Sequence, residues 1–223
     1  MLLLSFCSTI ALAKEDNDQT LKDSLAVIDE IMNSPDQEIP TELISQAKAV
    51  LIFPTLVKAG FLVGGRYGNG VASMRSRNSG KFGPPTFLTQ AGLSVGFQIG
   101  AEAVDLVLLV MTQRGLESLL KDELTLGADA AVSAGPVGRH AEAATDIRMK
   151  GEIYSYSRSK GAFAGVSLKG TVISTDKGAN FDYYGQSLKA KDILMRGKVK
   201  KIPDSGKRFI EELNFLAPPR KRR

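Results

Sequence analysis

Hydrophobic positions change their spacing along the chain, from a helical repeat near the N-terminus to the shorter repeats of strands. In residues 20–33 an apolar side chain returns every third or fourth position, and Pro35 follows. This pattern predicts a helix that ends before the proline, with its apolar stripe packed in the core. A second short helix is predicted over residues 41–49, after Pro40, and a third over residues 113–120.

Most of the chain after residue 49 carries short apolar runs bounded by glycine or proline, which is typical of strands. Residues 93–99 alternate strictly between apolar and polar or glycine positions, so we expect a strand with one buried face that includes Leu93. The strands predicted in this way cover residues 50–53, 60–63, 70–74, 93–99, 104–111, 153–159, 163–174 (two or three strands) and 181–184.

Asp204 is placed to cap a last helix, which carries Phe209, Ile210, Leu213 and Phe215. The predicted fold class is therefore α+β, with an antiparallel β-rich sheet or barrel-like core flanked by N-terminal and C-terminal helices. About 210 residues after the N-terminal segment are enough for one domain with a sizeable core.

The first thirteen residues, MLLLSFCSTIALA, have the pattern of a cleaved signal peptide. The apolar run is too short to span a bilayer, and small residues precede the predicted cleavage after Ala13. We therefore expect a signal peptide over residues 1–13, one domain over residues 14–216, and a basic tail over residues 217–223. Export without disulfides favours the periplasm or envelope of a Gram-negative bacterium.

Few residues could support metal or cofactor chemistry. Cleavage after Ala13 removes the one cysteine and leaves a single histidine, His140, so neither a zinc site nor any other cofactor is expected. Asp176, Asn180 and Asp182 lack the spacing of a calcium loop, which favours a turn with solvated carboxylates.

A serine hydrolase is the enzyme that the sequence comes nearest to. Gly92 to Gly96 match the G-x-S-x-G pattern around Ser94, and Asp105 or Asp129 and then His140 follow in hydrolase order. The nucleophile of that motif needs a sharp turn between strand and helix, whereas the alternating pattern runs straight through Ser94. A strand serine is the favoured interpretation, and an esterase stays the weaker alternative.

Positive charge is concentrated at the C-terminal end. Residues 189–223 hold twelve Lys or Arg and four Asp or Glu, a net charge of +8, while the rest of the chain has a net charge of −3. Such a segment attracts phosphate groups. The candidate contacts with lipid head groups are Lys198, Lys200, Lys201, Lys207, Arg208, Arg220, Lys221, Arg222 and Arg223, together with Arg66 in its glycine-rich run and Arg139.

A nucleic-acid partner is not expected, because a nuclear signal at residues 220–223 conflicts with export. The acidic first helix has the wrong charge for an anionic membrane. Asp105 stands within an apolar run, so we expect it to be partly buried and paired with an arginine or with backbone donors.

Several segments resemble the SYLF domain family in consistent order over roughly residues 20–215. These segments are residues 47–54, 58–68, 105–109, 131–139, 141–146, 152–158, 163–168 and 183–185. Two departures are Phe82 and Phe97, which stand where the family pattern leads us to expect tryptophan.

The resemblance implies a lipid-binding module, since eukaryotic members associate with phosphoinositide membranes and a yeast branch binds actin. Bacterial members are commonly exported and have no assigned reaction. The sequence thus predicts a non-catalytic protein of the cell envelope that binds anionic phospholipid. The alternative is a protein-interaction or scaffold module, which could also self-associate.

Overall fold

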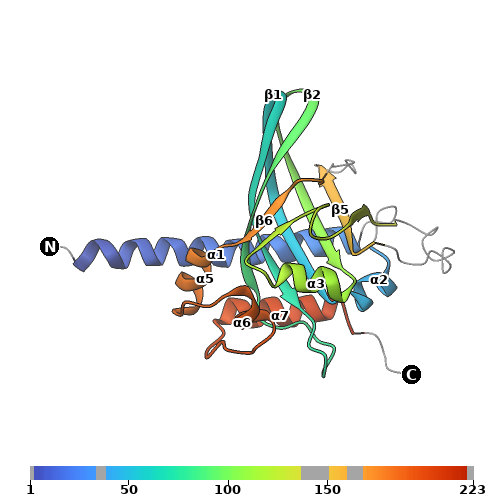
Figure 1. The fold of residues 1–223 in the computed structure, drawn as a ribbon. Coiled ribbons are helices and arrows are strands. Elements are labelled where there is room, and N and C mark those ends of the chain that lie inside the picture. Colours follow the sequence, from blue (N-terminus) through green and yellow to red (C-terminus); the bar gives the residue numbers. More distant parts are fainter. Residues whose placement is uncertain (1–2, 34–38, 137–150, 160–167, 220–223) are drawn as a thin grey trace.

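A computed structural model describes residues 3–33, 39–136, 151–159 and 168–219; residues 3–15, 58–63, 94–102 and 159 are described by their backbone alone. Helices pack around the base of one curled sheet, which confirms the α+β class (Figure 1). The elements are α1 (Leu3–Met32), α2 (Thr41–Gln46), β1 (Ala49–Met74), β2 (Thr86–Val110), α3 (Gln113–Leu119), β3 (Glu123–Thr125), β4 (Val132–Ala134), β5 (Ile153–Ser159), β6 (Val172–Thr175), α5 (Lys177–Tyr184), α6 (Ala190–Leu194) and α7 (Asp204–Leu216).

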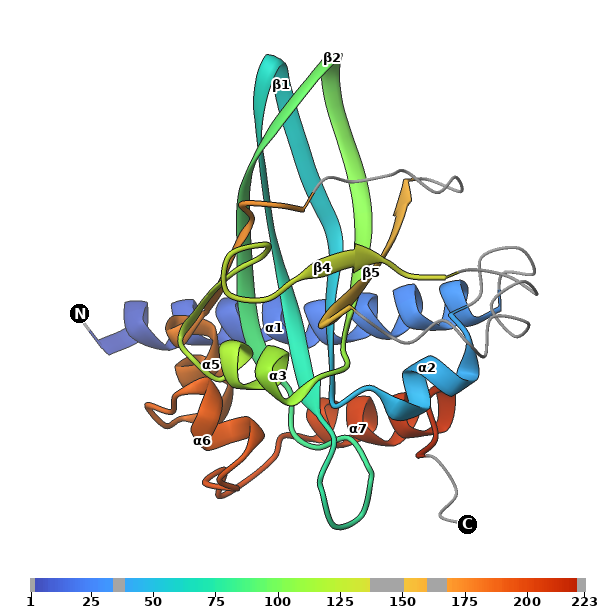
Figure 2. The ribbon, with the colours of Figure 1, turned by 45° about the vertical axis from the view of Figure 1, so that its right-hand side comes forward.

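Within these described residues the six strands form one sheet, in which β2 pairs with β1, β5 and β6 in antiparallel register. β3 continues the sheet beside β6, and β4 pairs with β5 in parallel register. β1 and β2 form a long ribbon whose far end projects away from the helices (Figures 1 and 2).

β1 folds back on itself, so that its two legs lie side by side. The register with β2 shifts between Gly60 and Leu62, near the far end of the ribbon. At the other end the backbone N–H of Arg75 donates to the carbonyl of Lys48 (2.8 Å), which brings the two ends of β1 together. The separate strands predicted over residues 50–53, 60–63 and 70–74 are therefore parts of one strand, and those over 93–99 and 104–111 are both parts of β2.

Glycines permit the close approach of the two legs. A Cβ on Gly70 would lie 2.4 Å from the carbonyl oxygen of Ile52 and 2.4 Å from the ring of Phe53. A Cβ on Gly68 would lie 2.6 Å from the Leu56 side chain. The glycine-rich run around Arg66 lies within the second leg of β1.

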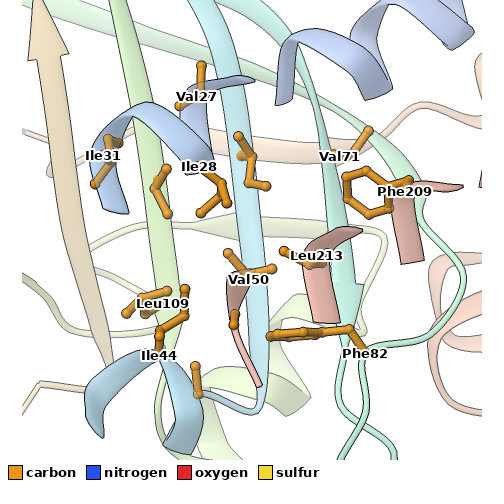
Figure 3. Close-up of a cluster of buried hydrophobic side chains, with 14 of the residues drawn as sticks. Val27, Ile28, Ile31, Ile44, Val50, Val71, Phe82, Leu109, Phe209 and Leu213 are labelled. Carbon is orange, nitrogen blue, oxygen red and sulfur yellow. The ribbon is translucent and has the colours of Figure 1, made fainter. Parts of the chain in front are cut away.

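The first leg of β1 is buried on both faces, as its continuous apolar run indicates. Val50 and Ile52 face a cluster formed with α1, α2 and α7, while Leu51 and Phe53 face a second cluster inside the curl. All four are 0% exposed. Figure 3 shows the first cluster, in which the predicted apolar stripe of α1 packs against the sheet. The residues of this cluster that the figure labels are Val27, Ile28, Ile31, Ile44, Val50, Val71, Phe82, Leu109, Phe209 and Leu213.

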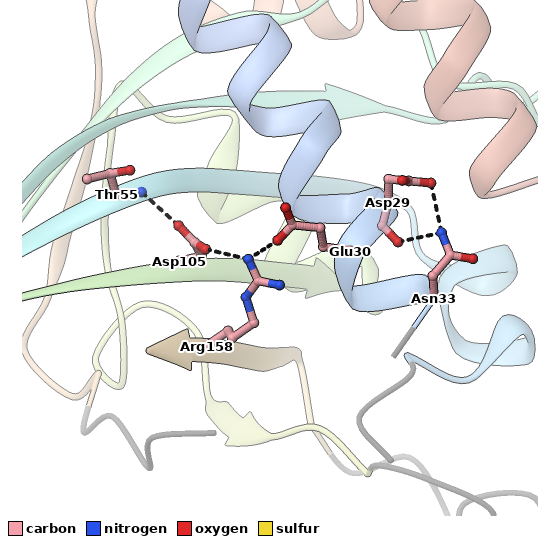
Figure 4. A network of polar contacts seen from close by, with 6 residues as sticks. All are labelled: Asp29, Glu30, Asn33, Thr55, Asp105 and Arg158. Atoms are coloured by element: carbon pink, nitrogen blue, oxygen red, sulfur yellow. Dashed lines mark hydrogen bonds and ion pairs between the residues drawn. The ribbon is translucent and has the colours of Figure 1, made fainter. Parts of the chain in front are cut away.

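An ion-pair network joins α1 to the sheet and confirms the pairing predicted for Asp105. The Arg158 guanidinium contacts both Glu30 of α1 and Asp105, whose second oxygen accepts from the N–H of Thr55 (3.0 Å; Figure 4). The Asp105 side chain is 20% exposed. Thr55 has φ +56 at the bulge between Phe53 and Leu56, so the carboxylate holds a backbone conformation that few non-glycine residues adopt.

Three further local predictions, concerning helix α5, the start of α7 and Leu93, are wrong. Residues 181–184, predicted as a strand, end helix α5, which Asp176 caps by accepting from Ala179 N (2.9 Å) and Gly185 closes at φ +64. Asp204 is the first residue of α7 rather than its cap, which is Pro203. Leu93 is 77% exposed instead of buried.

Two asparagines, the buried Asn180 and the half-buried Asn214, fasten helices to the sheet region. The Asn180 amide oxygen accepts from the N–H of Phe87 (3.0 Å) and its amide nitrogen donates to the carbonyl of the same residue (3.0 Å). Asn214 of α7 does the same with Phe82 (2.8 and 3.1 Å). Asn180 is thus a structural residue of α5 rather than part of a solvated turn.

Over the described ranges, none of the helices combines the length and apolar character needed to span a bilayer.

Candidate anion-binding surface

Basic residues gather at the end of the molecule opposite the β1–β2 tip. This end, here called the basic end, is formed by residues 76–81, α6, residues 195–203 and α7 (Figures 1 and 2). The described residues 189–217 carry eight Lys or Arg and four Asp or Glu, a net charge of +4. The sequence prediction of a basic C-terminal segment therefore corresponds to one region of the fold.

Part of this charge is neutralised locally. Asp192 of α6 bonds both Lys198 (3.0 Å) and Arg196 (3.1 Å), and only 12% of its side chain is exposed. The hydrogen bond from Lys198 is the largest of the influences that lower the pKa of this carboxyl. Asp192 thus holds the segment after α6 in place. It also neutralises part of the positive charge of Arg196 and Lys198, which is then less available to an external anion.

The remaining candidates on α7 and before it are exposed. Lys207 pairs with Asp204 (2.8 Å), one turn earlier on the same face. Lys200, Lys201 and Arg208 are exposed. These three side chains are the best placed of the predicted C-terminal contacts to meet an external anion.

Helix α7 packs most of its apolar stripe inward. Phe209 and Leu213 are 0% exposed, whereas Phe215 is 84% exposed. The helix is therefore an integral part of the core, and one aromatic ring remains outside it beside the basic residues.

The structure buries Arg66. This side chain is 4% exposed, and its Nη2 lies 3.4 Å from Thr171 Oγ1 inside the curl of the sheet. Burial lowers the pKa of the guanidinium. Arg66 is thus set apart from the basic end, and Arg139, Arg220, Lys221, Arg222 and Arg223 lie outside the described residues.

Sequence reasoning missed three cations that reach the basic end from elsewhere. Lys48 precedes β1, and Arg75 and Arg77 follow it; all three line one cavity beside the end of α6. They are far from the C-terminal segment in sequence, and they do not form a contiguous basic run that would have predicted them. The fold-back of β1 brings them together, and that feature has no simple sequence signature.

The chain matches the family described as "Ysc84: Las17-binding protein actin regulator" over residues 91–215. It is 40% identical to the human SH3 domain-containing YSC84-like protein 1 over 163 residues, which is 73% of this chain and 47% of that protein. The chain belongs to the Ysc84 (SYLF) family. The resemblance seen in the sequence is thereby confirmed.

Other relatives within the Ysc84 (SYLF) family are similar in extent. LAS seventeen-binding protein 3 of Saccharomyces cerevisiae is 40% identical over 171 residues, 75% of this chain and 37% of that protein. The Xenopus laevis YSC84-like protein is 36% identical over 184 residues, 82% of this chain and 54% of that protein. The chain thus spans about half or less of the length of these curated relatives. The family description and the yeast relative's name describe binding proteins, which supports a non-catalytic binding module.

The backbone geometry around Ser94 and the contacts of its candidate partners disfavour the serine hydrolase alternative. Residues 92–96 run inside β2, with Ser94 in register opposite Gly64, so the turn that a nucleophile elbow requires is not formed there. Asp105 is engaged by Arg158, and Asp129 accepts from Thr125 N (2.8 Å). His140 lies outside the described residues, and among those described no cluster of three metal-ligating side chains occurs.

Proposed function

We propose that this chain is a non-catalytic module that binds anionic phospholipid membranes through its basic end. The observation that carries the proposal is the meeting of exposed cations from α7 and residues 195–203 with Lys48 and Arg77 at one end of the fold. Each basic residue near an anionic membrane contributes about 1 kcal/mol. Phe215, exposed on α7, adds an apolar group that can enter the interface.

The proposal includes export, with residues 1–13 as a signal peptide. Among the α1 side chains that the structure describes, from residue 16 onward, those in the hydrophobic core begin at Leu21, and Asn17 donates to the carbonyl of Ala179 (3.2 Å). Cleavage after Ala13 would leave these contacts in place. Mass spectrometry of protein recovered from the periplasm of a Gram-negative host tests this step: Lys14 is the expected first residue, and retention of Met1 would contradict it.

Charge-neutralising substitutions test the membrane contact better than a truncation does, because removal of α7 would take Phe209 and Leu213 out of the core. We expect the double variant Lys200→Gln/Lys201→Gln to bind anionic vesicles about 30-fold more weakly, since it loses two contributions of about 1 kcal/mol.

The matched control is Lys121→Gln/Lys169→Gln, which removes the same charge from two exposed positions, after α3 and before β6. We expect this control to bind as the wild type does. Equal weakening of the two double variants would mean that net charge, and not the basic end, determines binding.

A second candidate function is a protein-binding module, which the family description and the yeast relative's name favour. A groove of about 450 Å³ between α1 and α7, with Phe215 at its edge, offers a surface for such a contact. The family description names an actin regulator. Co-sedimentation with purified actin filaments in the absence of lipid therefore tests this second candidate. Pelleting with filaments but not with vesicles would favour the second candidate over the first.

A further inference from the structure

A cavity of about 590 Å³ opens at the basic end, between the start of β1, the loop after it and the end of α6. Its polar lining includes Lys48, Arg75, Ser76, Arg77 and Gln113. Its volume lies within the range of small-molecule sites. The cavity is thus larger than a bare inorganic ion needs.

The lining is positively charged without compensation. Lys48, Arg75 and Arg77 contribute three cations, and none of the described residues that line the cavity is an Asp or Glu. Two other cations at this end have acidic partners, Lys198 with Asp192 and Lys207 with Asp204. The cavity differs from these two positions in that its cations are grouped without a carboxylate in the lining.

Among the cations of the cavity, the absence of an acidic partner in the lining is clearest for Arg75. Its side chain is 9% exposed, and its guanidinium donates to the carbonyls of Ala217 (2.8 Å), Gly80 (2.8 Å) and Ile44 (3.1 Å). These partners are neutral, and the guanidinium also lies 3.8 Å from the centroid of the Phe82 ring. Burial lowers the pKa of Arg75 to about 10. A buried cation held only by dipoles gains energy when an anion binds nearby.

Arg77 and Ser76 also present hydrogen-bond donors to the cavity. Arg77 Nη2 contacts only the neutral Gln113 side chain (3.2 Å) among its described partners, so its remaining N–H groups face no carboxylate there. Ser76 Oγ accepts from the backbone N–H of Asn78 (3.3 Å) and of Ser79 (3.4 Å). Because the hydroxyl oxygen already accepts twice, its hydrogen is left to donate.

We propose that this cavity binds a phosphate monoester group, presented either by a lipid head group or by a small soluble phosphate ester. The proposal rests on the proposed function, in that it names the specific subsite of the same basic end. Arg77 supplies a planar fork that can bond two phosphate oxygens, Lys48 supplies a point charge, and Ser76 supplies a hydroxyl donor. Met74, Leu116 and Met195 line the rest of the cavity and suit the organic part of the ester.

Calorimetric titration of the full chain with glycerol 3-phosphate at low salt tests the subsite, with glycerol as the neutral comparison. We expect binding of glycerol 3-phosphate and none of glycerol. Arg77→Gln and Lys48→Gln should each weaken the binding about tenfold or more, because each removes a charge-assisted contact. Lys169→Gln, which is exposed outside the cavity, should leave it unchanged.

Vesicles separate the two sources of the phosphate. A preference for vesicles that contain phosphatidic acid, a monoester, over vesicles of phosphatidylglycerol at equal surface charge identifies a lipid source if Arg77→Gln abolishes the preference. Binding of glycerol 3-phosphate without any such preference identifies a soluble ester. Thermal unfolding of each variant confirms that it is folded.

The proposal is overturned if the wild type neither binds glycerol 3-phosphate nor prefers phosphatidic acid, or if both cavity variants behave as the wild type does. Salt-sensitive pelleting with phosphatidylglycerol vesicles would then still support the general membrane contact. Loss of all vesicle binding with retained glycerol 3-phosphate binding would instead remove the proposed function and keep the subsite.

Discussion

Gly70→Ala tests the fold-back of β1, on which the grouping of Lys48, Arg75 and Arg77 depends. The added Cβ would lie 2.4 Å from the Ile52 carbonyl oxygen and from the Phe53 ring, whereas non-bonded atoms of this kind keep about 3.5 Å. The overlap of about 1 Å involves backbone, so a side-chain rotation cannot relieve it. The legs must separate and loosen the packing around Phe53, which is 0% exposed.

Overpacking of a dense core costs about 1–3 kcal/mol and sometimes more. We expect Gly70→Ala to lower the free energy of unfolding by about 3 kcal/mol, which for a chain of this size corresponds to a Tm lower by about 6–12 °C. Urea unfolding followed by circular dichroism gives the free energy, and a thermal scan gives the Tm.

Gly65→Ala is the matched control, because it lies on the same strand and a Cβ there meets nothing within 4 Å. We expect this variant to be unchanged or stabilised by up to about 1 kcal/mol, since alanine has less backbone freedom to lose on folding. Gly70→Ala within about 0.5 kcal/mol of the wild type, or equal destabilisation by the two variants, would refute the close approach of the legs.

Further substitutions test other contacts. Asn180→Ala removes both hydrogen bonds to the Phe87 backbone and should cost about 2–4 kcal/mol in urea unfolding; a loss under 0.5 kcal/mol would contradict the link from α5 to the sheet. Asp192→Asn should be less stable than the wild type at pH 7. Because the folded-state pKa of Asp192 is lowered below 3.8, this difference should shrink as the pH falls below about 4 and through that pKa, and a constant difference down to pH 2 would contradict it. Arg158→Met should cost about 1–3 kcal/mol in urea unfolding by leaving the partly buried Asp105 carboxylate without its counter-charge, and no change would contradict the network.

The sequence was a good guide to burial in continuous apolar runs and a poor guide to where strands end. Residues 50–53 pack on both faces, as their pattern predicts. The glycines and prolines after them resemble turns, yet Pro54 and Thr55 lie at a bulge, Gly60 lies at the fold-over, and Gly70 permits a close contact. Local sequence does not distinguish these roles from a turn, because each depends on the neighbouring leg.

Residues 181–184 show how capping can override strand propensity. Phe181, Tyr183 and Tyr184 favour a strand by composition. The Asp176 cap and the left-handed Gly185 define the limits of a helix around them, and the Asn180 contacts fix that helix against β2. The predicted turn at Asp176 is the beginning of this helix.

Basic residues that are close together in the sequence were predicted as part of the candidate site, whereas those dispersed along the chain were missed. Lys200, Lys201 and Arg208 come from one basic stretch and are exposed, as expected. The pairing of Lys198 with Asp192 depends on the path of the chain after α6, so the sequence alone overstates the free charge there. The cavity cations come from both ends of β1 and become neighbours only through its fold-back.

Co-sedimentation of the wild-type chain with vesicles tests the central claim most directly. The comparison is between neutral phosphatidylcholine vesicles and vesicles that contain phosphatidylglycerol, each at 50 mM and at 500 mM salt. Binding through the basic end predicts pelleting with the anionic vesicles at low salt, a marked loss at high salt, and none with the neutral vesicles. Failure to pellet with anionic vesicles at low salt, or equal pelleting with neutral ones, would contradict it.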